Sequence, residues 1–284
     1  TERPTLGRAI LIPGRFGTGK TLLASQLMAS IVRKGGLARM VALEQPASDY
    51  LYMLSSFGAL PSDTDVRVIT DPSKMLTGTE REPGSERGTL IILGSIKDSF
   101  DDFRSMFEAT GTMLARSYPL RVICVDPVNS VHRGPAHGAQ RTELFDSIMK
   151  IKRTGTNVIL VAEDDAQADA QSWFESNIVD TVRQLAEESQ HTKYRQRYLQ
   201  ISKSRLQREQ RGWHPYSIRP AHGFEIFPSP AAVNARIQSR RTGAGGARDH
   251  VRFGFRDLDS VLGPKALMPG ELIAFRGAIG SYKS

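Results

Sequence analysis

Short apolar runs that alternate with amphipathic stretches set the tightest limit on the fold of this chain. The apolar runs, which are rich in Val, Ile and Leu and lack clean alternation, are residues 9–12, 38–43, 122–125 and 158–162. Such runs are typical of parallel strands that are buried on both faces. Helical patterns are found at residues 21–32, 96–116 and 141–152. This order predicts an α/β fold with a doubly wound, mainly parallel sheet flanked by helices.

Composition excludes several classes of protein. The 284 residues are 39% hydrophobic and 24% charged, as expected for a globular chain and not for a disordered one. No apolar run approaches the roughly 20 residues of a membrane-spanning helix, and the first residues do not resemble a signal peptide. The single cysteine, Cys124, excludes a disulfide framework within the chain and argues against a cysteine-based zinc site. We therefore expect a cytoplasmic protein.

A glycine-rich segment, GRFGTGKT from Gly14 to Thr21, joins the first apolar run to the first helical stretch. It matches the GxxxxGK[ST] pattern in the strand–loop–helix setting of a phosphate-binding loop. Glycines let backbone N–H groups surround phosphate oxygens, and the start of the helix adds partial positive charge. We expect Lys20 to reach the terminal phosphates and Thr21 to hold Mg²⁺. The candidate nucleotide-binding residues are Gly14, Phe16, Gly17, Thr18, Gly19, Lys20, Thr21 and Leu22.

Two carboxylates end predicted strands. Asp126 closes the apolar segment LRVICVD, which is a Walker B pattern, and is the second candidate ligand for Mg²⁺. Glu44 follows the run at residues 38–43 and is the candidate general base for hydrolysis. The alternatives are a turn-capping role for Asp126 and a solvated position before Pro46 for Glu44.

These motifs, in this order, resemble the KaiC-like ATPases of the RecA-like P-loop superfamily. The further matching segments are residues 43–45, 55–58, 125–131, 141–155, 178–180, 199–205 and 223–228. The resemblance implies a RecA-like fold and a Mg²⁺-dependent ATPase that assembles into a ring, usually a hexamer, with ATP between subunits. It makes Glu44 the catalytic glutamate. Gln45 stands where the family has a second glutamate, so we expect slow hydrolysis.

The same resemblance matches Lys203 and Arg205 to a basic pair that reaches the γ-phosphate in the neighbouring subunit. In a regular strand, Leu199, Ile201, Lys203 and Arg205 would share one face, with the two cations projecting past the apolar part. A cation supplied in trans stabilises charge on the transferring phosphate. The candidate catalytic residues are therefore Lys20, Glu44, Lys203 and Arg205. The alternative for the last two is a solvated edge strand.

A change of pattern near the C-terminus predicts two domains. Residues 242–248, TGAGGAR, are typical of a flexible linker and would follow an ATPase domain at residues 1–241. The family's lead-in segment is nearly absent before Thr5. Residues 249–284 resemble the truncated start of a second such domain. Its phosphate loop would be degenerate, because Tyr282 replaces the glycine beside Lys283.

Positive charge is concentrated in the C-terminal third. Residues 191–220 contain eight Lys and Arg against one acid, and residues 231–256 contain six Arg against one acid, in a chain of net charge +8. Such a surface suits nucleic acid, or an acidic neighbour and its bound phosphates. Residues 163–171, EDDAQADAQ, occupy a position where DNA motors of the superfamily hold DNA, yet they carry four acids and no base. This disfavours nucleic acid.

The leading interpretation is a ring-forming ATPase that acts as a nucleotide-controlled switch or assembly ATPase on an unidentified protein partner. One alternative is a DNA-dependent motor or recombinase of the same superfamily. Another is a non-catalytic, nucleotide-gated scaffold, which Gln45 and Tyr282 favour.

Overall fold

The computed structural model describes residues 7–58, 60–70, 87–94, 100–113, 118, 120–131, 137–164, 177–188, 195–205 and 212–234. All of them except Val233 and Asn234 belong to the first of two compact units, Thr1–Ala232 and Val233–Ser284. The predicted linker at residues 242–248 and the predicted second domain at 249–284 lie outside the described residues. Within the described part, no helix is long and apolar enough to span a membrane.

The described strands are β1 (Ala9–Gly14), β2 (Leu37–Ala42), β3 (Asp65–Ile69), β4 (Thr89–Gly94), β5 (Arg121–Asp126), β6 (Asn157–Glu163), β7 (Thr181–Glu188), β8 (Gln196–Ser204), β9 (His214–Arg219) and β10 (Gly223–Ile226). The described helices are α1 (Lys20–Val32), α2 (Ala47–Ser56), α3 (Phe100–Met113), α4 (His137–Arg153) and a short 3₁₀ helix, η2 (Val128–Val131).

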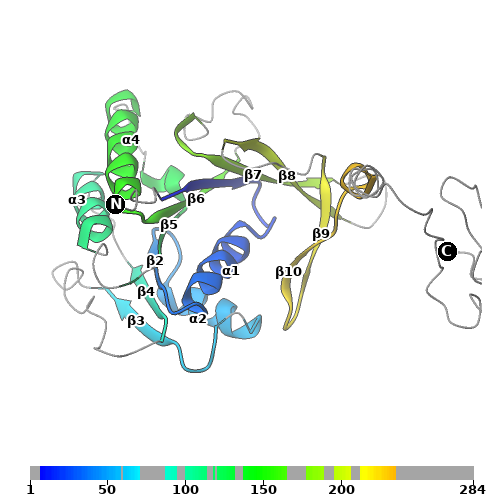
Figure 1. Ribbon diagram of the computed structural model, residues 1–284, viewed down its shortest axis with the longest axis horizontal. Coiled ribbons are helices and arrows are strands. Elements are labelled where there is room, and N and C mark those ends of the chain that lie inside the picture. The colour runs from blue at the N-terminus through cyan, green and yellow to red at the C-terminus, as the bar shows by residue number, and fades with distance from the viewer. Residues whose placement is uncertain are drawn as a thin grey trace, which may run out of the picture. The chain divides into compact units, whose positions relative to one another are not determined.

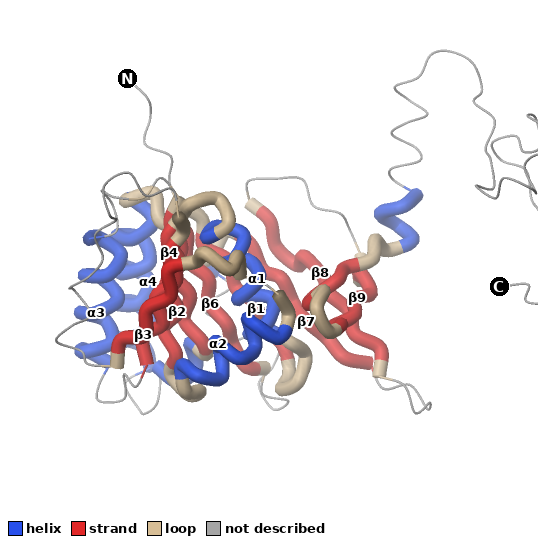
Figure 2. The backbone as a smooth tube through the Cα atoms, turned by 90° about the horizontal axis from the view of Figure 1, so that it is seen from below, coloured by secondary structure: helices blue, strands red, loops and turns tan. Residues whose placement is uncertain are grey.

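The strands form one sheet in the order β10-β9-β8-β7-β1-β6-β5-β2-β4-β3. Every neighbouring pair from β7 to β3 is parallel. Strands β8, β9 and β10 extend the β7 side as an antiparallel meander, and the strands succeed one another as a single row in Figure 2. The predicted doubly wound, mainly parallel sheet is thus confirmed.

Helices cover both faces of the parallel strands, which explains the uninterrupted apolar runs. All six residues of β2 and of β4 are buried, as expected for strands with no solvent-facing side. On one face, Phe107 of α3 and Ile148 of α4 enter the core. On the other, Met28 of α1 and Leu54 of α2 do so. Figure 1 shows these two helix pairs on opposite sides of the sheet.

The four predicted strands are β1, β2, β5 and β6, and the predicted helix at residues 141–152 lies within α4. The helix predicted at residues 96–116 is observed as Phe100–Met113. Strand β4 was not predicted, although its run TLIILG is fully apolar after the first residue. It directly follows residues 71–88, a polar stretch whose prolines and glycines are typical of a surface loop. Strands β3, β7, β8, β9 and β10 were also missed, except for residues 199–205, because they are only partly buried and lack a continuous apolar run.

Strand β8 contains a bulge that changes one expectation. Lys203 pairs with Val182 and Ile201 pairs with Arg183, so Ser202 is an extra residue on β8. Facing residues share a side of the sheet, and successive residues alternate sides. Lys203 and Arg205 therefore do not continue the face of Leu199 and Ile201, and the regular alternation expected from the sequence is wrong at this point.

Candidate active site

The phosphate loop connects the end of β1 to the start of α1, at the carboxyl edge of the parallel strands. Gly17 and Gly19 have positive φ angles of 79° and 86°, a conformation that glycine adopts without strain. Gly19 is also the N-cap of α1, where no side-chain hydrogen bond caps the helix. The partial positive charge of the helix start is thereby left facing the loop.

Contacts from distant parts of the chain hold this loop in shape. The fully buried Thr18 hydroxyl donates to the Arg15 carbonyl at 2.8 Å, and the Tyr216 hydroxyl of β9 donates to the Thr18 carbonyl at 2.6 Å. A Cβ atom on Gly19 would lie only 2.6 Å from Cδ1 of Ile218, also on β9. The antiparallel meander thus supports the loop from outside the parallel sheet.

The loop forms one wall of a pocket of about 290 Å³. Eight of the predicted site residues line it: Phe16, Gly17, Gly19, Lys20, Thr21, Leu22, Glu44 and Asp126. They are joined by Gln45, Tyr50, Met53, Pro127 and Glu163. Gly14 lies instead against the Leu185 carbonyl, and the Thr18 side chain is turned into the protein. The loop, the metal ligands and the base predicted from the sequence therefore meet in one place.

Lys20 lies on the floor of the pocket and is only 7% exposed. Its ammonium donates a hydrogen bond to the Arg15 carbonyl at 3.0 Å and forms an ion pair with Glu163 at 3.7 Å. Burial lowers the pKa of Lys20, while the carboxylates of Glu163 and Asp126 oppose that shift by favouring the charged ammonium. Among the described residues that line it, the pocket therefore presents one positively charged group, Lys20, together with three acidic groups.

Asp126 is 4% exposed and accepts a hydrogen bond from the Tyr50 hydroxyl at 3.3 Å. Burial raises the pKa of Asp126 to about 6, although hydrogen bonds from Thr21 and Tyr50 act in the other direction. Burial also raises the pKa of the Tyr50 hydroxyl, so Tyr50 stays a hydrogen-bond donor. The carboxylate and the Thr21 hydroxyl are thus in contact beside Lys20.

This donor set fits Mg²⁺ brought in with a nucleotide. Mg²⁺ prefers oxygen ligands and is usually bound by one or two protein groups, with phosphates and water completing its shell. Thr21 and Asp126 supply two such oxygens. Among the described residues, no group of three or more His, Cys, Asp or Glu could hold a metal ion by itself. The site therefore matches a metal that depends on the phosphates it accompanies.

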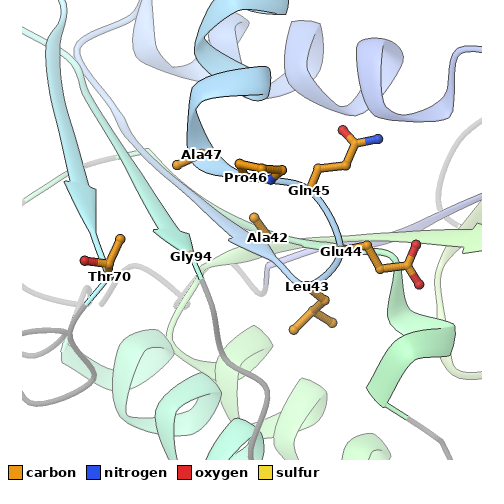
Figure 3. Close-up of a pocket in the computed structure, with 8 residues that line it drawn as sticks. All are labelled: Ala42, Leu43, Glu44, Gln45, Pro46, Ala47, Thr70 and Gly94. Atoms are coloured by element: carbon orange, nitrogen blue, oxygen red, sulfur yellow. The ribbon is translucent and has the colours of Figure 1, made fainter.

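The turn after β2 holds Glu44 and Gln45, whose side chains point in different directions in Figure 3. Glu44 accepts a hydrogen bond from the Ser130 hydroxyl of η2, which gives its carboxylate a defined orientation at the pocket. Both residues also line a second cavity of about 270 Å³, which reaches Thr70 and Gly94 at the ends of neighbouring strands. Because their side chains point in different directions (Figure 3) and Glu44 is bonded to Ser130, the two adjacent residues are not equivalent in position.

Lys203 and Arg205 lie away from this pocket. Ser204 pairs with Thr181, the first residue of β7, and Thr181 in turn pairs with Ile10 near the start of β1. The phosphate loop follows the opposite end of β1. Both cationic side chains donate to the Asn177 carbonyl, at 3.5 Å and 3.3 Å. The structure thus brings the two cations together, but not to the nucleotide pocket of their own chain.

Three residues of the site were missed from the sequence, and one of them had a readable signal. Glu163 ends the apolar run at residues 158–162 in the same way that Glu44 and Asp126 end theirs. The strand-end argument applied to those two carboxylates also selects Glu163. Tyr50 and Tyr216 carried no comparable signal, because they come from a helix and a strand that reach the site only through the tertiary fold.

Comparisons with known proteins find one family that matches most of the chain. A family model described as the KaiC ATPase matches residues 4–231. The circadian clock oscillator protein KaiC of Synechococcus elongatus is 26% identical over 287 residues, which is 98% of this chain and 50% of the relative. The circadian clock protein KaiC3 of Synechocystis is 25% identical over 98% of this chain and 51% of its own length. This chain thus spans about half the length of the curated relatives it matches.

Among solved structures, a KaiC-like protein from the hyperthermophilic archaeon Pyrococcus horikoshii is similar in fold. The superposition has a TM-score of 0.56 at 21% sequence identity and covers 78% of this chain and 90% of that one.

Proposed function

The chain belongs to the KaiC ATPase family, and on that premise we propose that it binds Mg²⁺–ATP in the pocket beside its phosphate loop and hydrolyses it. The observation that carries the proposal is the convergence of Lys20, Thr21, Asp126 and Glu44 on one pocket. These residues come from two strand ends and a helix start, and together they supply the groups that phosphoryl transfer to water requires.

Each group has a distinct task in this proposal. Lys20 offsets the charge of the terminal phosphates from the floor of the pocket. Thr21 and Asp126 would hold Mg²⁺, which when bound neutralises charge on the phosphate oxygens. Glu44 orients the attacking water and accepts its proton, with its carboxylate held by Ser130. Gln45 carries no charge and takes no part in proton transfer.

We also propose that the site is completed by a second copy of the chain in a ring, with six subunits expected. Lys203 and Arg205 lie side by side at the edge of the sheet opposite the phosphate loop, so they cannot serve their own pocket in this arrangement. In a head-to-tail ring, one edge of each subunit faces the other edge of its neighbour. The two cations would then approach the γ-phosphate held by the next subunit.

Mixing two inactive variants tests the shared site. Glu44→Gln keeps the cations, and Arg205→Ala keeps the base, so mixed rings contain some interfaces that combine both intact halves. We expect each variant alone to hydrolyse ATP poorly, and the mixture to recover a measurable fraction of wild-type phosphate release. The specific activity of the wild-type chain should also rise with protein concentration, because the site depends on assembly.

The matched control is Arg195→Ala. Arg195 is an exposed cation just before the start of β8, at the end opposite to Lys203 and Arg205, and it forms an ion pair with Glu187 of β7. This variant should hydrolyse ATP at close to the wild-type rate. Failure of the mixture to recover activity, in rings shown to exchange subunits, would place the action of Arg205 within its own chain. Hydrolysis at full rate by a monomer would eliminate the shared site.

Nucleotide binding should depend on pH through Asp126. Because the pKa of this carboxyl is raised to about 6 and Mg²⁺ requires the carboxylate, protons compete with the metal below that pH. We expect the affinity for Mg²⁺–ADP to be level above pH 7 and to fall by up to about tenfold per unit below pH 6. Calorimetric titrations between pH 5 and 8 measure this. In Asp126→Asn, any pH dependence of the affinity that remains comes from protonation of the nucleotide itself. If the affinity of this variant falls with pH as steeply as that of the wild type, Asp126 is not the group responsible.

A switch or assembly role, acting on a protein partner, is the broader function that we propose for such a ring. Hydrolysis rate and ring assembly, measured together with and without Mg²⁺–ATP, address that role directly. If ATP drives assembly without measurable turnover, the chain acts as a nucleotide-gated scaffold instead of an ATPase.

A further inference from the structure

Glu163 is an acidic residue of the pocket to which the proposed chemistry gives no task. It is the last residue of β6, and in the sheet register it lies opposite Gly14, the first residue of the phosphate loop. Its side chain is 46% exposed, and its carboxylate forms the ion pair with the Lys20 ammonium at 3.7 Å. The group that must meet the terminal phosphates is therefore already engaged by a carboxylate of the same chain.

The backbone on which Glu163 stands is tied on two sides. Its N–H donates to Oδ1 of Asn129 at 2.7 Å, and Nδ2 of Asn129 donates back to the Glu163 carbonyl at 3.3 Å. The N–H of the next residue, Asp164, donates to the Gly14 carbonyl at 3.0 Å. These bonds join the end of β6 to η2 and to the phosphate loop. The backbone that carries the Glu163 carboxylate is thus fixed in position beside the phosphate loop.

The three carboxylates that line the pocket differ in what would offset their charge once a nucleotide is bound. Asp126 would face Mg²⁺, whereas Glu44 accepts a hydrogen bond from the Ser130 hydroxyl and would face the attacking water. Glu163 has Lys20 as its ion-pair partner, and among the carboxylates around the Lys20 ammonium it exerts the strongest attraction. When the ammonium turns to the phosphates, the negative charge of Glu163 stays beside them and repels them.

We propose that Glu163 is an internal competitor of the terminal phosphate, which weakens the binding of ATP more than that of ADP. The inference rests on the proposed function of this pocket. The γ-phosphate adds negative charge at the end of the nucleotide nearest to Lys20 and Glu163, whereas ADP ends one phosphate earlier. The preference of this chain for ADP over ATP is thus set by Glu163, whose ion pair with Lys20 must break before the triphosphate binds.

Glu163→Gln tests the competition, because it removes the charge while keeping the size of the side chain and the backbone bonds to Asn129. Affinities for Mg²⁺–ADP and for the Mg²⁺ complex of adenylyl imidodiphosphate, a non-hydrolysable triphosphate, are measured by calorimetry. We expect the triphosphate to bind about three- to tenfold more tightly to the variant than to the wild type, and ADP to change by less than about twofold. The difference should shrink at high salt, which screens the repulsion.

Asp164→Asn is the matched control, since it removes a neighbouring charge that attracts Lys20 less strongly than Glu163 does. It should shift the ratio of the two affinities by less than about twofold. Glu163→Ala serves as a second variant and should move the ratio in the same direction as Glu163→Gln.

Three results would overturn the inference. An unchanged ratio in both Glu163 variants, with both nucleotides bound, would refute the competition and leave the proposed function standing. Weaker binding of both nucleotides would mean that Glu163 instead positions Lys20 for the phosphates. Absence of any nucleotide binding by the wild-type chain would remove the proposed function, and this inference with it.

Discussion

Replacing Lys20 with alanine is expected to abolish measurable ATP binding. Lys20 is the only cationic side chain among the described residues that line the pocket. Without it, the phosphates would face the carboxylates of Asp126 and Glu163 with no protein charge to oppose the repulsion. Removing one partner of a buried charge pair costs several kcal/mol, so affinity should fall by at least about a hundredfold. Calorimetry with Mg²⁺–ATP measures the loss.

Lys34→Ala is the control for this variant, because it removes a cation of the same kind from an exposed position just beyond α1. It should bind ATP as the wild type does. Both variants should give the same circular dichroism as the wild type. Wild-type affinity in a folded Lys20→Ala protein would show that the segment from Gly14 to Thr21 does not bind phosphate.

Glu44→Gln should leave ATP bound but slow hydrolysis by at least about a hundredfold. A general base contributes on the order of 10²–10⁴ to the rate, and glutamine cannot accept the proton of the attacking water. The change preserves the shape of the side chain, and the amide oxygen can still accept the hydrogen bond from Ser130. Steady-state phosphate release, with binding measured in parallel, separates the two effects.

Gln45→Ala is the informative comparison, since the neighbouring residue lines the same pocket but points elsewhere from the turn (Figure 3). Its effect on hydrolysis should be far smaller than that of Glu44→Gln. Equal losses from the two substitutions would indicate that the shape of the turn matters, and not the carboxylate of Glu44.

The centre of the parallel sheet, strands β1, β2, β5 and β6, could be predicted from the sequence because its signals are local. A buried parallel strand needs an apolar run of its own, and a phosphate loop needs its glycines and lysine in one continuous stretch. The antiparallel strands carry weaker signals, since β8 and β9 are only partly buried. Which residues fit such a strand depends on the side chains they pack against on neighbouring strands, and a single sequence does not reveal those partners.

The site residues differ in the same way: those with a local sequence signal were predicted, and features that depend on the tertiary fold were not. Lys20 and Thr21 were found from the continuous phosphate-loop motif, and Glu44 and Asp126 were found because strand ends in a parallel sheet converge on one edge. The bulge at Ser202 was not, since an inserted residue leaves no mark in a pattern of alternating side chains. It reverses the side of the sheet on which Lys203 lies. The expected pairing of Lys203 with Arg205 survives, because both residues follow the bulge.

The seating of Gly19 beneath β9 has a consequence for engineering. A side chain at this position would need a left-handed backbone and would also collide with Ile218, while Tyr216 grips the neighbouring carbonyl. The conformation of the phosphate loop therefore depends on β9 as well as on its own sequence. Transplanting residues 9–32 into another parallel sheet would carry over the motif without the strand that clamps it, so a faithful graft must include β9 and its two loop-facing side chains.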